Sequence, residues 1–222
     1  MTDGSRPPRA PSPRTRVRRG ADRADYDPGT VRRILDAAMI AHVGVVTDDG
    51  PLVLPMAYGR DDDTLYLHGA VANHLLASAA DAEVCVTVTL VDGLVMARTP
   101  FHNSMNYRSV VVRGQAREVA DPDERLRALR LITDHVVANW DHGRPVSDAD
   151  LRRTRVAAVS LDEASAKIRT GDPVDEPEDV AGPWWAGVIP VETRFGAPRP
   201  AADLAPGVDP RPPFAVPDGV GR

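Results

Sequence analysis

The Asp-Asp-Gly turn at residues 48–50 constrains the fold more than any other feature, because largely apolar runs flank it on both sides. An Asp-Gly pair supplies the positive φ of a tight hairpin turn, so residues 41–47 and 52–58 are predicted to pair as antiparallel strands. A second turn at residues 61–63 leads into a predicted strand over residues 64–68. Strands joined by short turns are typical of an antiparallel sheet rather than a series of β-α-β units.

Three further strands complete the predicted sheet. Valines alternate with threonines and Cys85 over residues 83–91, which indicates a strand with one buried face. Longer runs predict strands over residues 106–119, where Gly114 indicates a bend, and over residues 156–169. About six antiparallel strands close most economically as a small barrel, because closure leaves no unpaired edge. The sequence therefore predicts an α+β fold, an antiparallel β-barrel with peripheral helices.

Helices are predicted where a capping residue precedes an apolar periodicity. Asp27 followed by Pro28 begins the first helix, and further helices are predicted over residues 71–80, 121–139 and 148–153. These segments lie between the predicted strands, so they are expected on the outside of the barrel.

The length of 222 residues fits one domain with tails. Residues 1–25 are rich in arginine and proline and show no apolar periodicity, so we expect a disordered leader. Prolines crowd residues 196–222 and predict a tail without regular strands, which could lie across a partner subunit. The folded domain is therefore predicted over residues 26–195.

Charge and cysteine content argue against several classes of protein. The net charge is −5 although arginines crowd the leader, so the remainder is clearly acidic and no nucleic-acid partner is expected. The single cysteine, Cys85, excludes an internal disulfide and a cysteine-rich zinc site, and it indicates a reducing, cytoplasmic location. No apolar run approaches the ~20 residues of a membrane-spanning helix, so no membrane partner is expected.

The sequence lacks the signatures of common hydrolases and nucleotide-binding enzymes. We find no Gly-x-Gly-x-x-Gly after a strand, no Walker loop, no His-Glu-x-x-His and no Gly-x-Ser-x-Gly. The histidines have no carboxylate or cysteine at ligand spacing, so no metal site is predicted. His42 is expected to be structural, and no role is assigned to His135 or His142.

A first polar cluster, residues 67–75, combines a strand end, a glycine and a helix start. Backbone N–H groups at a helix start favour an anion such as a phosphate, and His74 could add a donor. The alternative is structural: His68 would end the strand, Gly69 would provide the turn, and His74 would be solvated. Alternation along the preceding strand predicts that Tyr66 and His68 share a polar face.

A second polar cluster, residues 101–111, offers more donors than a strand needs, among them Asn106, Arg108 and Ser109. Arg108 could hold a phosphate or a carboxylate through two hydrogen bonds, or it could be an exposed strand arginine. The tryptophan pair at residues 184–185 lies outside the main pattern, and it would either cover the barrel end or stack on a flat ligand.

In their order and spacing, these motifs resemble the FMN-binding split-barrel family, which includes the pyridoxamine 5′-phosphate oxidases, and especially its branch related to nitroimidazole reductases. The resemblance spans about residues 28–191, so both tails lie outside it. It rests on Val43-Gly44-Val45-Val46-Thr47-Asp48-Asp49-Gly50-Pro51, Pro55-Met56, Leu65-Tyr66-Leu67-His68-Gly69, Asn73-His74-Leu75-Leu76, the strand over residues 83–91 and Ser104-Met105-Asn106-Tyr107-Arg108-Ser109.

The resemblance implies a homodimer of six-stranded split β-barrels, with FMN in the clefts between the two chains. One strand would run beside the flavin ring, a strand end and the following helix would meet its phosphate, and the partner chain would contribute a further strand. The cofactor-binding residues implied are Leu54, Pro55, Met56 and Ala57 at the ring, His68, Gly69 and His74 at the phosphate, Asn106, Tyr107, Arg108 and Ser109 from the partner, and Trp185 near the ring.

Two departures from the family qualify this expectation. His74 stands where oxidases of the family often carry a lysine, so phosphate affinity could be weaker or pH dependent, and FAD or a deazaflavin is an alternative to FMN. The segments over residues 183–187 and 192–195 do not match the substrate-phosphate signature of the pyridoxamine phosphate oxidases, so vitamin oxidation is not expected. His68, at the cleft edge, is the candidate catalytic residue that would donate a proton or orient a polar substrate.

The expected function is therefore hydride transfer through FMN from a nicotinamide donor to a small aromatic or nitro-type substrate. A first alternative is a non-catalytic carrier or sensor that binds flavin or haem. A second is a regulatory module whose arginine-rich leader meets an acidic partner.

Overall fold

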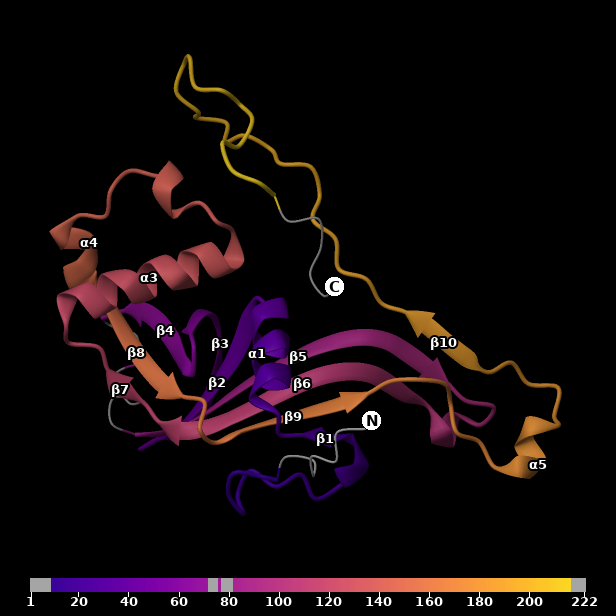
Figure 1. Cartoon of the computed structure of the whole chain (residues 1–222). Helices are drawn as coiled ribbons and strands as arrows, with labels where there is room; N and C mark the ends of the chain where they lie inside the picture. The colour runs from indigo at the N-terminus through magenta and orange to yellow at the C-terminus, as the bar shows by residue number, and fades with distance from the viewer. Residues whose placement is uncertain (1–8, 72–75, 77–81, 217–222) are drawn as a thin grey trace, which may run out of the picture.

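A long, curved antiparallel sheet forms the body of the molecule, and the longer helices pack against it (Figure 1). The computed structural model describes residues 9–71, 76 and 82–216. Within these residues the strand order is β1-β9-β6-β5-β2-β3-β4-β8-β7, and β10 pairs with β5 outside this path. Neighbouring strands pair antiparallel, which confirms the predicted α+β class.

The predicted hairpin is present: β2 (Ile40–Thr47) pairs with β3 (Gly50–Asp61). Thr47 pairs with Gly50, so two aspartates form the loop between them. Gly50 has a φ of 112°, a conformation that favours glycine, and the Thr47 hydroxyl donates a hydrogen bond of 2.8 Å to the Gly50 carbonyl. The positive φ indicated by the Asp-Gly pair therefore belongs to the glycine that ends the turn.

The next strands of the barrel wall extend beyond most of their predicted limits. β5 and β6 form a long hairpin that projects well beyond the rest of the sheet (Figure 1). The strands in this part of the chain are β4 (Thr64–Ala70), β5 (Glu83–Met96), β6 (Ser104–Gln115) and β7 (Arg117–Glu118).

The prediction of one strand over residues 156–169 is wrong, because the structure divides this region into β8 (Thr154–Ser160) and β9 (Ala164–Arg169). β8 pairs with β4 and β9 pairs with β6, so the turn between them carries the chain from one part of the sheet to another. In this turn the Leu161 N–H donates a hydrogen bond of 2.8 Å to the Asp63 carbonyl. Both halves have strand propensity, so the local pattern does not reveal that they pair with different strands.

One bent strand closes the barrel. β6 and β7 are separated only by Ala116, whose N–H donates a hydrogen bond of 2.9 Å to the Ala82 carbonyl. β6 pairs with β5 and β7 pairs with β8, which are the two ends of the ladder β5-β2-β3-β4-β8. The bend predicted at Gly114 therefore lies next to the point where the barrel closes.

Two hydrophobic clusters lie on opposite faces of β4. The larger cluster fills the barrel and includes Leu65 and Leu67. The second lies between the outer face of β4, β8 and the helix α3 (Pro122–Val136), and it includes Tyr66, which is only 3% exposed. The predicted polar face of β4 is therefore wrong at Tyr66, because α3 covers this face.

The helix starts predicted from capping residues are confirmed. Asp27 caps α1 (Pro28–Ala37) and Asp121 caps α3, each by accepting a hydrogen bond from a backbone N–H of the first turn. Ser147 forms a capping box at the start of α4 (Asp148–Arg153). Single turns of 3₁₀ helix occur at Ala21–Arg23, Pro100–His102 and Trp140–His142.

β3 and α3 approach each other closely at Gly59. A Cβ atom at this position would lie 2.6 Å from backbone atoms of Leu131 and Ile132. Glycine therefore permits α3 to lie directly on the sheet and to cover Tyr66, which pairs with Gly59 across the ladder.

The expected disorder of residues 1–25 does not extend to the described part of the leader. β1 (Ala24–Asp25) pairs with β9, and Thr15 is 6% exposed. Arg14 forms ion pairs with Glu83 and Glu163, which lie next to the barrel wall. These acidic partners are distant in the sequence, so the composition of the leader alone does not indicate that it packs against the domain.

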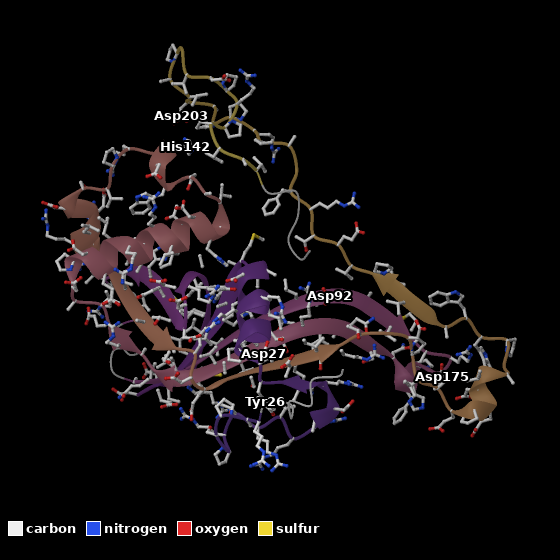
Figure 2. All side chains as sticks on the ribbon, viewed as in Figure 1. Tyr26, Asp27, Asp92, His142, Asp175 and Asp203 are labelled. Carbon is white, nitrogen blue, oxygen red and sulfur yellow. The ribbon has the colours of Figure 1, made fainter. Side chains whose placement is uncertain are left out.

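After β9 the chain wraps around the tip of the β5–β6 hairpin (Figure 1). It forms α5 (Pro177–Val180) and returns as β10 (Gly187–Pro190), a strand that the sequence did not predict and that pairs with the end of β5. Residues 197–216 form turns without helix or strand. Figure 2 shows this tail near His142, whose ring centroid lies 5.9 Å from that of Phe214. No helix among the described residues is long and apolar enough to cross a membrane.

Candidate functional site

The segment expected to flank a flavin ring lies on β3, where successive side chains point in opposite directions. Leu54 and Met56 face the barrel interior, and Met56 belongs to the larger hydrophobic cluster. Pro55 is exposed on the outer face and pairs with His42 of β2, while Ala57 packs against the second cluster. Of these four residues, Pro55 is therefore the one presented on the exposed outer face.

The outer face of β3, β2 and β5 is apolar and exposed. Val46 is 78% exposed and Val53 is 59% exposed. A groove of about 450 Å³ follows this face, and its lining includes both valines with Gly44, Cys85 and Arg113. Exposed apolar surfaces of this kind mark sites for a second protein surface or a flat ligand.

His68 and Gly69 lie near the end of β4 and are directed to opposite faces of the sheet. Their partners on β8 are Val156 and Arg155, respectively. Arg155 also forms an ion pair of 3.2 Å with Glu118. Arg155 could not be identified from local sequence, because only strand pairing brings this cation next to Gly69. The strand end thus carries an arginine whose charge is paired with a carboxylate of the same chain.

The His68 imidazole is half-buried and shares a face of β4 with Tyr66. Its Nδ1 atom is buried and has no hydrogen-bond partner. Burial lowers the pKa of His68 below its ordinary value, because desolvation disfavours the charged form. His68 is therefore neutral at neutral pH, and a neutral imidazole can accept a proton or bind a metal ion.

His74, which was expected to meet the phosphate, lies outside the described residues, as does most of the helix predicted over residues 71–80. At the start of this segment the Val71 N–H donates a hydrogen bond of 3.0 Å to the Arg153 carbonyl. Leu76 is fully buried in the larger cluster. Val71 thus contacts the end of α4, and Leu76 lies in the barrel interior.

Two of the β6 residues expected to reach a partner chain make hydrogen bonds within their own chain. The Asn106 amide donates a hydrogen bond of 3.1 Å to the Gly171 carbonyl, and its oxygen accepts one from Arg169. The Ser109 hydroxyl donates a hydrogen bond of 3.2 Å to the Lys167 carbonyl. These bonds join β6 to β9 and to the segment that follows it.

Arg108 holds a carboxylate of its own chain. Its guanidinium donates two hydrogen bonds, of 2.9 and 2.7 Å, to Asp92, and this partner raises the pKa of Arg108. The sequence left a phosphate, a carboxylate or solvent open for Arg108, and it did not indicate Asp92 as the partner. The neighbouring Tyr107 is half-buried and pairs with Val91.

The strand order separates the two groups of expected flavin-binding residues. β6 lies next to β5, and β5 and β2 stand between β6 and β3. One chain therefore brings residues 54–57 close to residues 68–69 on adjacent strands, but it does not bring residues 106–109 to them.

Trp185 is 66% exposed, and its ring lies over Gly187, where a Cβ atom would be 3.0 Å from the ring. From the adjoining β10, Ile189 pairs with Leu94, which in turn pairs with Met105. These three side chains are 48%, 37% and 50% exposed, so they form an apolar row across three strands. This row was not predicted from the sequence, because the pairing of β10 with β5 is not a local property.

The described residues suit a flat, partly anionic ligand. Exposed apolar strands offer a surface for a ring system, and Arg113 and Arg155 offer positive charge near the groove and near the end of β4. Among the described residues, no group of three or more His, Cys, Asp or Glu side chains is arranged to hold a metal ion.

Comparison with known proteins supports this interpretation. A family model described as pyridoxamine 5′-phosphate oxidase matches residues 27–168. The structure of the flavocytochrome Anf3 from Azotobacter vinelandii is 40% identical, with a TM-score of 0.89 over 95% of this chain and 100% of its own. The FAD and haem binding protein from Mycobacterium smegmatis is 34% identical, with a TM-score of 0.80 over 86% of this chain and 94% of its own.

A further match comes from Bacteroides thetaiotaomicron, a protein described as a candidate 5-nitroimidazole antibiotic resistance protein. It is 28% identical, with a TM-score of 0.55 over 65% of this chain and 86% of its own. No curated protein matches the sequence significantly. The family model spans more than half of the chain, and the split-barrel fold agrees with it. This chain therefore belongs to the pyridoxamine 5′-phosphate oxidase family of flavin-binding split-barrel proteins.

Proposed function

We propose that this protein is a redox protein that binds both a flavin and haem. The observation that carries the proposal is the extent of the structural match. The family model ends at residue 168, whereas the relatives named as a flavocytochrome and as an FAD and haem binding protein cover 95% and 86% of the chain. Coverage of 95% must include most of the segment beyond β9, which wraps around the β5–β6 hairpin.

In this proposal the flavin lies between two copies of the chain. The exposed apolar face around Val46, Val53 and Pro55 would be covered by the second copy, because apolar surface of this extent is stabilised when it is removed from water. A second copy would also supply the β6 strand that one chain keeps apart from residues 54–57. The proposed assembly is thus a homodimer in which each flavin contacts both chains.

For the flavin itself we propose FAD. The resemblance in the sequence favoured FMN, but the relative from Mycobacterium smegmatis, which is 34% identical, is named for FAD. Chromatography of the flavin released from purified protein by heat distinguishes the two directly. Release of FMN alone would reject FAD and restore the FMN expectation.

When bound, a flavin accepts two electrons as a hydride from a nicotinamide and can pass them singly to haem iron. The chain provides position and an environment of low polarity for this exchange. Its single cysteine is a free thiol, so we place the protein in the reducing cytoplasm.

The test is the absorption spectrum of the protein purified with haem precursor in the growth medium. The proposal expects a flavin band together with a haem Soret band, each in stoichiometric amount. Addition of NADH or NADPH under anaerobic conditions should reduce the flavin first and the haem afterwards. A protein that retains flavin but takes up no haem would overturn the two-cofactor proposal.

A second candidate function is flavin-dependent reduction of a small aromatic or nitro compound. Its support is the 28% identity to the candidate nitroimidazole resistance protein. In this case, reduced flavin should be reoxidised anaerobically by a nitroimidazole, with stoichiometric loss of the nitro absorbance. Reoxidation by oxygen or by the haem but not by the nitro compound would reject this candidate.

A further inference from the structure

We propose that the arginine-rich leader of one chain binds residues 172–184 of a second copy of this chain. We call residues 172–184 the acidic loop. The inference rests on the homodimer of the proposed function, and it assigns the two surfaces that orient the copies. Each surface carries charged groups that its own described residues leave without a partner.

The leader presents exposed positive charge. Seven arginines and three aspartates lie within residues 1–25, although the whole chain has a net charge of −5. Four of these arginines are exposed and have guanidinium groups that form no ion pair or hydrogen bond with the described residues, namely Arg9, Arg16, Arg18 and Arg19. The leader therefore offers a local positive charge to an acidic surface of another molecule.

Contacts with the rest of the chain hold these arginines in place. The Val17 backbone N–H donates a hydrogen bond of 2.8 Å to the Tyr26 hydroxyl, and the Lys167 ammonium donates one of 2.9 Å to the Arg19 carbonyl. The backbone is thus attached on both sides of Arg18. A surface that is already ordered loses less conformational entropy when a partner binds it.

The leader also curves around a hollow of about 540 Å³. Arg16 and Arg18 line this hollow together with Pro11, Pro13 and Val17, and the described residues that line it include no acid. Guanidinium groups bind both the faces of aromatic rings and carboxylates. The hollow therefore suits an aromatic side chain with carboxylates beside it.

The acidic loop has this chemistry. It contains five acids and no lysine or arginine, and among the five Asp175 binds Arg98. Trp184, at the end of the loop, is 57% exposed. The other four acids have side chains that form no ion pair or hydrogen bond with the described residues, namely Asp172, Glu176, Glu178 and Asp179. Exposed tryptophan beside unpaired carboxylates thus complements the hollow of the leader.

The two surfaces lie far apart within one chain. Arg14 of the leader binds Glu83, the first residue of β5, whereas β10, which follows the acidic loop, pairs with residues 93–96 at the other end of β5. Ten residues of a strand span about 30 Å. Figure 1 shows α5, which belongs to the acidic loop, at one end of the molecule and away from the indigo leader. A contact between the two surfaces therefore has to join two chains.

A twofold axis that crosses β5 would bring the two surfaces together twice. In the proposed homodimer the second copy covers the outer face of β2, β3 and β5. If the axis lies in this interface and crosses β5, the start of each β5 faces the end of the other, and each leader meets the acidic loop of the other chain. An axis along β5 would place leader against leader and acidic loop against acidic loop, where like charges repel. Charge complementarity therefore favours the first orientation.

The test is a charge-reversal cycle in which sedimentation equilibrium measures the dissociation constant of the dimer. Arg16→Glu/Arg18→Glu and Asp172→Arg/Glu176→Arg should each weaken dimerisation by about tenfold at low salt, because like charges then face each other. The four substitutions together should restore the dissociation constant of the wild type to within about threefold, because the charges are again complementary. High salt should reduce all these differences.

The matched control is Arg152→Glu/Arg153→Glu. It reverses two exposed arginines of α4, which lies at the opposite end of the molecule from α5 (Figure 1). It should leave dimerisation unchanged and should fail to restore it when combined with Asp172→Arg/Glu176→Arg. That combination has the same net charge as the fourfold variant of the cycle, so it separates a specific contact from an effect of net charge.

Photocrosslinking locates the contact directly. With p-benzoylphenylalanine in place of Trp184, irradiation should give a covalent dimer whose crosslink lies within residues 9–21. Two results would overturn the contact while leaving the proposed homodimer intact: a covalent dimer crosslinked only outside the leader, or reversals that the fourfold variant does not restore. A wild-type protein that is monomeric would instead reject the proposed homodimer, and this contact with it.

Discussion

Arg108 and Asp92 form a two-pronged ion pair at the bulge that interrupts the β5–β6 ladder. The ladder shifts its register between Val91 and Gly93, so Asp92 is the additional residue on β5. Its carboxylate accepts hydrogen bonds of 2.9 and 2.7 Å from the Arg108 guanidinium, and the two side chains are 33% and 24% exposed. Asp92, the bulge residue, is thus the partner of Arg108, which the sequence indicated as a candidate phosphate ligand.

Replacement of Arg108 with Ala should therefore lower stability and leave flavin occupancy unchanged. We expect a loss of roughly 1–2 kcal/mol in the free energy of unfolding, because a partly exposed bidentate pair is worth less than a fully buried one. Urea denaturation of Arg108→Ala, Asp92→Ala and the double variant measures the coupling between the two residues. A clear loss of flavin with little loss of stability would assign Arg108 to the cofactor instead.

Gly59 should not tolerate a methyl group. In Gly59→Ala the Cβ atom would lie 2.6 Å from the α3 backbone, so the helix must shift, and overpacking of this kind costs roughly 1–3 kcal/mol. Thermal unfolding measures the change. Gly143→Ala is the matched control, because a Cβ atom there meets nothing within 4 Å and its φ of −96° suits alanine. Equal melting temperatures for both variants would contradict the close contact between β3 and α3.

Asp175 should hold the C-terminal segment against the hairpin tip. Its carboxylate accepts hydrogen bonds from the Arg98 backbone N–H (2.9 Å) and from the Arg98 guanidinium (3.0 Å), and its side chain is fully buried. Figure 2 shows Asp175 at the end of the molecule that carries α5. Asp175→Ala should increase cleavage between residues 170 and 190 in limited proteolysis, because it leaves Arg98 without its carboxylate.

Glu178→Gln is the control for this experiment, since Glu178 is exposed on α5. It removes a carboxylate from the same segment without removing a buried hydrogen bond. Its rate of cleavage should equal that of the wild type. Similar protection of Asp175→Ala and Glu178→Gln would show that the segment is held by β10 alone.

Removal of residues 1–25 should lower the melting temperature, in contrast to the behaviour of a disordered leader. The truncation removes the β1–β9 pairing and the ion pairs of Arg14 with Glu83 and Glu163. The contribution of the Arg14 ion pairs to the melting temperature should decrease as salt increases, because these side chains are partly solvated. Differential scanning calorimetry of Arg14→Ala at low and high salt separates it from the strand pairing. An unchanged melting temperature after truncation would restore the expected disordered leader.

Stability should fall as the pH decreases below about 6.5, the ordinary pKa of histidine, because His68 contributes to this dependence. Burial lowers the pKa of His68 in the folded protein, so the unfolded chain binds a proton at higher pH than the folded chain does. Between these two pKa values protonation favours unfolding, and above both of them the effect is absent. The slope of unfolding free energy against pH should be smaller for His68→Gln than for the wild type, with His142→Gln as the exposed control.

The local elements of this protein could be predicted from its sequence. The hairpin at Gly50, the caps at Asp27 and Asp121 and the bounds of α4 each depend on residues within a few positions of one another. The overall class also follows, because antiparallel strands with short connections leave few alternatives to a barrel. Family membership was expected from the order of short motifs that include the hairpin over residues 43–51, and the match over residues 27–168 confirms it.

The long-range pairings could not be predicted from local patterns. The sequence pattern over residues 156–169 is that of a single strand, yet its two halves pair with β4 and β6. The same limit applies to the Arg14 ion pairs and to β10, whose partners lie about 70 to 150 residues away along the chain.

The sequence by itself determined the turns and the helix starts, because backbone preferences and capping act over a few residues. Only the tertiary structure decided which faces are covered and which charges are paired. α3 turns the outer face of β4 into a second hydrophobic cluster, and it leaves His68 half-buried with an unsatisfied nitrogen. Burial and hydrogen bonding of a side chain depend on segments that are distant in sequence, so these properties arise when the chain packs.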